Sequence, residues 1–240
     1  MKSTLLYCAA LLILFTQLPA CSKKSSSPPS TVANSCKLTG INGVSANGLE
    51  TYSITYNSDG KVSTIVQSSS GSTLKMTYTY SGNVILMISS GYTNGDVVTD
   101  SVVVNSDGLM LSDLERNIFG TSLTTYTYTG TEVASSIFQE AGQTPSATTF
   151  TFTNGDLTGA APTNIYTYSD KPSAPGDYIQ ILQLIVYAAP YIKTAHQCTS
   201  YTSNGETSNF TYAYDSTGKI TQMVVTGSSD FTFNYSYDCN

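Results

Sequence analysis

The chain contains no tryptophan and a single histidine, His196. It also lacks Cys-x-x-Cys, His-Glu-x-x-His and Gly-x-Ser-x-Gly, the spacings that build zinc sites and nucleophilic serine sites. Any Ser-His-Asp site would have to use His196, and an isolated histidine is more often structural than catalytic. We therefore expect no cofactor, no metal and no enzyme activity. A hydrolase that uses His196, or a pair of carboxylates, is the catalytic alternative.

Charge is also scarce. Charged residues make up 11% of the chain, with sixteen Asp and Glu against ten Lys and Arg. A protein that binds nucleic acid needs a basic patch for the phosphates, and no stretch supplies one, so we expect no nucleic-acid partner. Ser, Thr, Gly and Tyr are abundant instead, which is typical of exported β-proteins.

The first 20 residues have the layout of an export signal. Lys2 gives a basic start, and the apolar run from Leu5 to Leu14 is about 10 residues long, too short to span a bilayer as a helix. The run leads to Leu18-Pro19-Ala20-Cys21, which resembles the lipobox of bacterial lipoproteins. The resemblance implies cleavage before Cys21 and attachment to the membrane through lipid on that cysteine.

Residues 21–35 are predicted to form a tether, and residues 36–240 a single domain. Ser, Pro and Lys dominate the tether, which is typical of a flexible linker. Ser22 stands where aspartate marks inner-membrane retention in well-studied lipoproteins, which implies the outer membrane. Lys23 and Lys24 stand where acidic residues mark surface export in some Gram-negative groups, which favours the periplasmic face.

Aromatic and aliphatic residues alternate with Thr and Ser along most of the domain. In Thr51-Tyr52-Ser53-Ile54-Thr55-Tyr56, for example, every second residue is large and apolar. Because successive side chains of a strand point to opposite faces, each such run has one aromatic face and one Thr/Ser face. The same pattern recurs at 76–80, 102–104, 126–128, 150–152, 166–168, 210–214 and 231–237.

Turns that contain glycine follow these runs, and Asn or Asp often precedes the glycine, which is a hairpin signal. They lie at Gly60, Gly82, Gly108, Gly130, Gly155 and Gly218. The first five glycines are 22, 26, 22 and 25 residues apart, which leaves room for two strands and two turns. The repeat is therefore a β-hairpin, and the array is an antiparallel up-and-down meander.

One segment, 177–189, breaks this rhythm and is predicted to be a short buried helix. It is longer than a typical strand, is apolar nearly all round, begins at the capping residue Asp177 and is followed by Pro190. Its many β-branched residues leave a pair of strands as the alternative.

A long meander exposes two sheet edges unless it curls, so we expect a barrel or a strongly curved half-barrel with the helix filling or covering it. Cys36 opens the first strand and Cys239 ends the last, and these ends are neighbours in a closed meander with an even number of strands. We therefore predict a Cys36–Cys239 disulfide with Cys198 unpaired. Cys36–Cys198 and Cys198–Cys239 are the alternatives, because connectivity cannot be deduced from sequence.

The clearest hairpin unit is Tyr212-Ala213-Tyr214-Asp215-Ser216-Thr217-Gly218-Lys219-Ile220. It is similar to the YD repeats of Rhs-type proteins. The whole layout of lipobox, Ser/Pro tether, Tyr/Asp/Gly hairpins and a late helix with Pro190-Tyr191 after it resembles a family of uncharacterised lipoproteins of Gram-negative bacteria of the Bacteroidetes type. That family is described as having a porin-like fold and no known function. The resemblance implies a barrel over residues 36–240 and supplies no catalytic residues.

The eighteen tyrosines are the residues most open to a binding role. They could form a stacking surface for a glycan, lipid or protein ligand, or they could be cross-strand core residues, which their regular position before turns favours. Those that would face a ligand are Tyr52, Tyr56, Tyr78, Tyr80, Tyr126, Tyr128, Tyr212 and Tyr214. The turn residues Asp59, Asp107, Asp156 and Asp215 are explained by turn chemistry, because each turn has too few carboxylates for calcium.

These features predict a monomeric, lipid-anchored β-domain of the cell envelope that is a non-enzymatic binding or structural module. The alternative is an outer-membrane porin-like channel, since strands of roughly 8–10 residues reach about far enough to cross. A porin turns its apolar face to lipid, whereas a water-soluble barrel turns that face inward. The chain end, Asp238-Cys239-Asn240, lacks the terminal aromatic residue common in outer-membrane barrels and argues against the channel.

Overall fold

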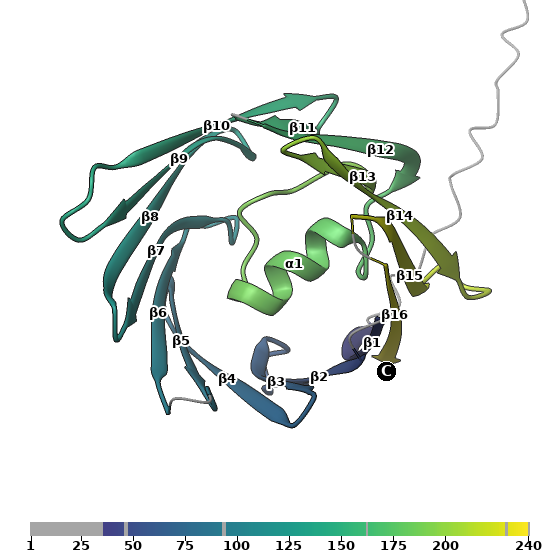
Figure 1. Ribbon diagram of the computed structural model, residues 1–240, viewed down its shortest axis with the longest axis horizontal. Helices are drawn as coiled ribbons and strands as arrows, with labels where there is room; N and C mark the ends of the chain where they lie inside the picture. The colour runs from purple at the N-terminus through teal and green to yellow at the C-terminus, as the bar shows by residue number, and fades with distance from the viewer. Residues whose placement is uncertain (1–35, 46–47, 93–94, 162, 229, 240) are drawn as a thin grey trace, which may run out of the picture. The chain divides into compact units, whose positions relative to one another are not determined.

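The computed structural model describes residues 36–45, 48–92, 95–161, 163–228 and 230–239, and within them sixteen antiparallel strands close into one barrel around a single helix (Figure 1). The strands are β1 Lys37–Ser45, β2 Gly48–Tyr56, β3 Val62–Ser69, β4 Ser72–Ser81, β5 Val84–Ser90, β6 Val97–Val104, β7 Met110–Asn117, β8 Gly120–Thr129, β9 Glu132–Glu140, β10 Ser146–Thr153, β11 Asp156–Ala160, β12 Asn164–Pro172, β13 His196–Ser203, β14 Glu206–Tyr214, β15 Ile220–Gly227 and β16 Phe231–Asp238. The helix α1 spans Tyr178–Tyr187.

The sheet closes where the two ends of the chain meet. β1 pairs with β16 from Lys37 opposite Asp238 to Ser45 opposite Phe231. The sulfurs of Cys36 and Cys239 lie next to this seam at disulfide distance, 2.13 Å apart, and Cys198 is a buried free thiol. The prediction of a closed meander is therefore confirmed, and the half-barrel alternative is not observed.

The strand connections fall on two rims. We call the rim where even-numbered strands end and odd-numbered strands begin the disulfide rim, because it carries Cys36 and Cys239. The segment 173–195, which includes α1, joins β12 to β13 and therefore also enters from this rim. The opposite end, where odd-numbered strands lead into even-numbered ones, is the far rim.

Three turns of the disulfide rim have the same hydrogen bonds, which explains the Asn/Asp-x-x-Gly signal. In the first, the side-chain oxygen of Asn57 accepts the backbone N–H groups of Asp59 and Lys61, and the N–H of Gly60 bonds the Asn57 carbonyl. Gly60 has a φ of 77°, which suits glycine. Asn105 and Asp215 accept the equivalent bonds in the turns after β6 and β14.

The aromatic face of the strands points into the barrel. On β4, Met76 and Tyr78 are buried in the core, while Thr77 and Thr79 between them are exposed. The same division holds on β14, where Phe210 is buried and Thr211 is exposed. The Thr/Ser face thus forms much of the outer wall, and one core of inward residues surrounds the helix.

Many of the inward tyrosines also bridge neighbouring strands at the disulfide rim through their hydroxyl groups. Tyr56 donates to the Leu38 carbonyl at 2.7 Å, and Tyr80 donates to the Val62 carbonyl at 2.9 Å. Tyr128, Tyr212 and Tyr237 reach the carbonyls of Met110, Cys198 and Ile220 in the same way. In each case the tyrosine lies near the end of an even strand, and its acceptor lies near the start of the preceding odd strand.

The helix lies inside the ring of strands (Figure 1). The carboxylate of Asp177 accepts the N–H of Gln180 and caps its start, and its last turn closes on Ala188, which has left-handed backbone. The amide of Gln183 binds the N–H groups of Tyr191 and Ile192 and the carbonyls of Ile179 and Ile192. The predicted helix is confirmed, two or fewer residues shorter at each end, and the pair of strands is not formed.

Two tyrosines of β16 test the role of the bridging hydroxyls. The Tyr237 hydroxyl lies 2.8 Å from the Ile220 carbonyl, whereas the buried Tyr235 hydroxyl has no partner among the described residues. We expect Tyr237→Phe to lower the free energy of unfolding by about 1 kcal/mol, and Tyr235→Phe to leave it unchanged or raise it, because an unpaired buried hydroxyl is itself costly. Urea unfolding of both variants measures the difference, and equal effects would contradict the bridging role.

Candidate functional site

The eight tyrosines selected from the sequence all lie on the inward face. Their rings pack against the core, and most of their hydroxyls are bonded to the protein: Tyr52 to Glu50, Tyr214 to Gln197, and four others to backbone carbonyls of neighbouring strands. Tyr78 is buried under the helix, near the Ile185 carbonyl. Tyr56 is the member of this set that lines the larger pocket described below. A ligand-binding role stays a prediction for all eight.

His196 has an acidic partner. Its ring Nδ1 is 2.7 Å from the Asp156 carboxylate, and its backbone N–H donates to the other Asp156 oxygen at 2.8 Å. Asp156 therefore fixes the start of β13 to the start of β11. Among the described residues the ring has no hydrogen bond to a serine, threonine or cysteine, and neither residue lines a described pocket. Within these residues, no hydroxyl or thiol nucleophile is therefore in hydrogen-bond contact with the pair.

The described residues contain no group of three or more His, Cys, Asp or Glu side chains placed to hold a metal ion. The Asp215 carboxylate is used by its own turn, where the Thr217 hydroxyl and the N–H of Lys219 donate to it. Within the part of the chain that is described, no helix is long and apolar enough to cross a membrane.

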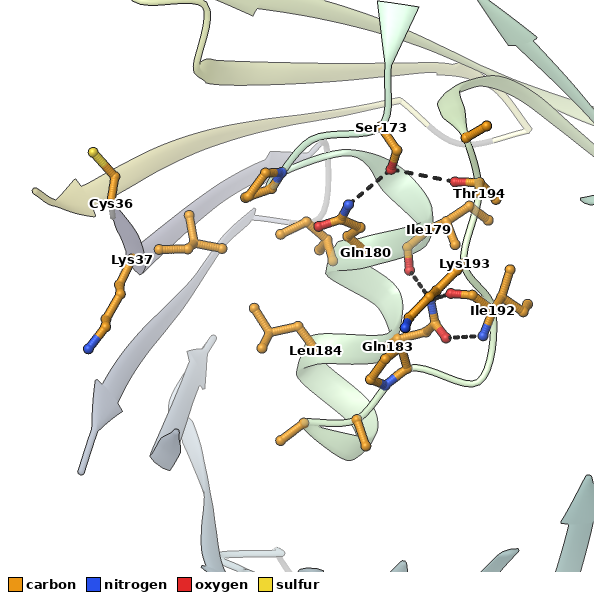
Figure 2. A pocket seen from close by; sticks show the side chains of 18 of the residues that line it. Cys36, Lys37, Ser173, Ile179, Gln180, Gln183, Leu184, Ile192, Lys193 and Thr194 are labelled. Carbon is orange, nitrogen blue, oxygen red and sulfur yellow. Dashed lines mark hydrogen bonds between the residues drawn. The ribbon is translucent and has the colours of Figure 1, made fainter. Parts of the chain in front are cut away.

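The larger pocket, of about 630 Å³, lies beside the helix at the disulfide rim, and we call it the rim pocket. Figure 2 shows Leu184 on the helix side facing the space toward Lys37, with Lys193 on the segment after the helix. Most of its lining is apolar, and Ile179 and Ile192 contribute to it. Its charged lining residues are two lysines, so the pocket combines apolar walls with positive charge.

The wall of the rim pocket is held by a small polar network. The Ser173 hydroxyl donates to Asp177 at 2.5 Å, and the Gln180 side chain donates to the Ser173 hydroxyl at 2.9 Å. Burial raises the pKa of Asp177, although the Ser173 hydroxyl and the backbone N–H groups of Gln180 and Ala174, which donate to the carboxylate, oppose the shift. The network joins the end of β12 to the first turn of the helix and so holds one part of the pocket wall in place.

A second group of side chains lies on the inner wall of β6 and β7. In the β6–β7 register, Asp100 lies opposite Glu115, and Asp113 lies opposite Val102, one of the fully buried core residues. Burial, and then the neighbouring Asp113 and Glu115 carboxylates, raise the pKa of Asp100 to about 7. Burial and Glu115 raise the pKa of Asp113 to about 6. We call Asp100, Asp113 and Glu115 the acidic wall.

Sequence reasoning missed the acidic wall and both lysines of the rim pocket. A sequence signal for the acidic wall did exist. Asp100 and Val102 belong to the same set of alternate positions in their strand, and the other residues at those positions are apolar. The register that sets Asp100 against Glu115 could not be read from the chain. Lys37 and Lys193 are 156 positions apart and meet only through the path of segment 173–195.

The chain is similar in structure to a porin-like protein from Bacteroides uniformis, whose crystal structure was determined at 2.32 Å resolution. The TM-score is 0.60 at 16% sequence identity, and the match covers 84% of this chain and 98% of the other. Comparison with protein families and with curated protein sequences gave no match. At this identity the likeness shows the fold, so the expectation of a porin-like β fold is confirmed. Lipidation and similarity to Rhs repeats stay predictions.

The acidic wall makes stability depend on pH. The pKa of Asp100 is raised in the folded protein above its ordinary value of about 3.9, so the folded state holds a proton that the unfolded chain releases. Stability should therefore fall as the pH rises from about 4 to about 7 and then level off. Asp113 acts in the same sense, and Tyr78, Tyr92, Tyr126 and Tyr187 are the other titratable groups that face the pair.

Asp100→Asn should accordingly stabilise the protein at pH 8, by about 1 kcal/mol or more, and have little effect at pH 4. Thermal unfolding at both pH values measures the difference. Asp59→Asn, in an exposed turn, is the control and should show no such pH-dependent gain. An equal effect of Asp100→Asn at both pH values would show that the charge of the carboxylate is not the cause.

Proposed function

We propose that the protein is a lipid-anchored barrel of the cell envelope that stands in water and is a non-enzymatic binding module. The observation that carries the proposal is the polarity of the barrel, which has its aromatic face inside and Thr/Ser positions outside. A membrane barrel has the reverse pattern, with an apolar band toward lipid. Outward Thr77, Thr79, Thr151, Asn209 and Thr211 are all exposed, as is Lys75.

The rim pocket is the site that fits binding best. Its volume lies within the range of small-molecule sites, and its walls are apolar with two lysines. This chemistry suits the hydrocarbon part of an anionic amphiphile, with the acid group beside Lys37 or Lys193. Catalysis has less support, because no hydroxyl or thiol nucleophile among the described residues is in hydrogen-bond contact with His196 and Asp156, which lie outside the pocket.

Lipid labelling and a solubility assay test the proposal that the barrel is lipid-anchored and stands in water. The wild-type chain expressed in a Gram-negative host should incorporate labelled fatty acid and pellet with outer membranes. Cys21→Ser should abolish both, while a chain that starts at residue 22 should stay soluble and monomeric without detergent. Cys198→Ser is the matched control and should still be labelled. Labelling that persists in Cys21→Ser would refute the anchor.

The porin-like channel is the alternative, and the description of the structural neighbour favours it. The channel hypothesis predicts the opposite result for the chain that starts at residue 22. That chain would need detergent to stay in solution and would give stepwise conductance in a planar lipid bilayer. Solubility without detergent, combined with no conductance, decides for the water-exposed barrel.

Two tryptophan substitutions test the rim pocket. Leu184 lines the pocket, whereas Leu182 does not line it and is 44% exposed. Calorimetry with laurate below its micelle concentration should show binding that Leu184→Trp reduces at least tenfold and Leu182→Trp leaves unchanged. Lys37→Gln should weaken laurate but not dodecanol. Binding that survives Leu184→Trp would exclude this pocket as the site.

A further inference from the structure

The sulfurs of Cys36 and Cys239, which lie at disulfide distance, are open to solvent at the end of the seam. Cys36 directly precedes β1 and Cys239 directly follows β16, so both residues lie outside the paired strands. Cys239 is exposed, and Cys36 is half-buried. A thiol in solution can therefore reach the bond between these sulfurs at Cys239 without separating the two strands.

A cationic side chain lies beside both sulfurs. The ammonium nitrogen of Lys219 is 3.2 Å from Cys239 Sγ and 3.6 Å from Cys36 Sγ. Positive charge next to a cysteine stabilises its thiolate, and a disulfide whose thiolates are stabilised is reduced more readily. Lys219 is therefore placed to stabilise either sulfur when the bond between them is cut.

The turn after β14 and an aromatic ring hold Lys219 in this position. Its backbone N–H donates to the Asp215 carboxylate, its ammonium pairs with the same carboxylate at 3.3 Å, and the ammonium lies 5.6 Å from the centre of the Tyr237 ring. Asp215 therefore offsets part of the charge that Lys219 presents to the sulfurs. Lys37 and Asp238, the first residues paired across the seam, carry opposite charges and add little net charge.

We propose that the Cys36–Cys239 bond is a thiol-exchange site, which a dithiol of the Cys-x-x-Cys type on a partner protein reduces while the barrel stays folded. A thiolate of the partner attacks Cys239 Sγ, the bond to Cys36 breaks, and Cys36 leaves as a thiolate beside Lys219. The second thiol of the partner then attacks the mixed disulfide and releases Cys239 as a thiolate. Two electrons pass to the two cysteines, which take up the two protons that the dithiol gives up, and the partner is left as a disulfide.

Other contacts keep the seam closed once the bond is cut. β1 and β16 remain paired from Lys37 to Ser45, and the Tyr237 hydroxyl still bonds the Ile220 carbonyl of β15. Cys36 also lines the rim pocket, next to Lys37 in Figure 2, so the exchange takes place at the edge of that pocket.

The third cysteine of the barrel has the opposite character. Cys198 is a buried free thiol, and burial raises its pKa to about 12, which keeps it protonated and unreactive. Reduction of the folded barrel should therefore change the reactivity of Cys36 and Cys239 and leave Cys198 unchanged.

The turn after β2 supplies a matched control for Lys219. Lys61 follows Gly60 as Lys219 follows Gly218, and its ammonium lies 4.9 Å from the centre of the Tyr80 ring. Within the described residues, the hydrogen bonds that cysteine sulfurs accept come only from Lys219. Lys61→Met therefore removes a charge and an aromatic contact of the same kind without removing a contact to the bond.

Redox equilibrium of the full chain in glutathione buffers tests the proposal, with free thiols trapped by iodoacetamide and located by peptide mapping. The untreated chain should show Cys36 linked to Cys239. Lys219→Met should shift the equilibrium toward the disulfide about tenfold, or about 30 mV, because the thiolates lose their cation. Lys219→Arg should restore the wild-type equilibrium, and Lys61→Met should leave it unchanged.

Asp215→Asn should shift the equilibrium in the opposite direction, toward the thiols, by about threefold. The substitution removes the charge that offsets Lys219. It should also preserve the turn, because Asn57 and Asn105 accept the equivalent hydrogen bonds in the turns after β2 and β6.

Circular dichroism during reduction by dithiothreitol shows whether the barrel stays folded. The wild-type chain should become reduced at Cys36 and Cys239 with its β-sheet signal intact. Reduction only at urea concentrations that unfold the barrel would overturn the proposal. Equal effects of Lys219→Met and Lys61→Met, or an untreated chain without the Cys36–Cys239 link, would overturn it too. None of these measurements uses a ligand of the rim pocket, so the result is independent of the proposed binding function.

Discussion

The pairing of β1 with β16 is the contact on which the rest of the structure depends. Without it, sixteen strands would form an open sheet with two unpaired edges and an exposed aromatic face. With it, the aromatic face encloses a lumen, and the apolar helix has a place to be buried. The bond between Cys36 and Cys239 holds the seam across a sequence separation of 203 residues, so it restrains the ends of the sheet in the unfolded chain as well.

Tyrosine serves this architecture better than phenylalanine because it has two functions at one position. Its ring packs into the core inside the barrel, and its hydroxyl donates to a carbonyl of the neighbouring strand. The acceptors Leu38 and Ile220 lie beside register shifts, where the ladder of backbone hydrogen bonds is interrupted. The recurring Tyr-x-Tyr before a turn is therefore mainly a sequence signal that marks the end of a hairpin strand.

Periodicity of two and glycine turns were sufficient to predict an antiparallel meander that curls into a barrel or half-barrel. The apolar segment between Asp177 and Pro190 was sufficient to predict the helix. These patterns could not predict which face points inward, because a porin and a water-soluble barrel share the same alternation. They also missed the acidic wall, since the contact of Asp100 with Glu115 follows from the β6–β7 register. The rhythm of turns fails after Gly155 for two physical reasons: β11 has only five residues, and segment 173–195 folds inward.

The helix is also the strongest structural argument for binding over conduction. Asp177 caps its start, and the Gln183 amide ties its middle to Tyr191 and Ile192, so its position is fixed by hydrogen bonds at two points. Leu184 of the helix lines the rim pocket, whose charged lining residues are Lys37 of β1 and Lys193 of the segment after the helix. A pocket beside a helix that is fixed in this way supports the proposal that the barrel binds a small molecule.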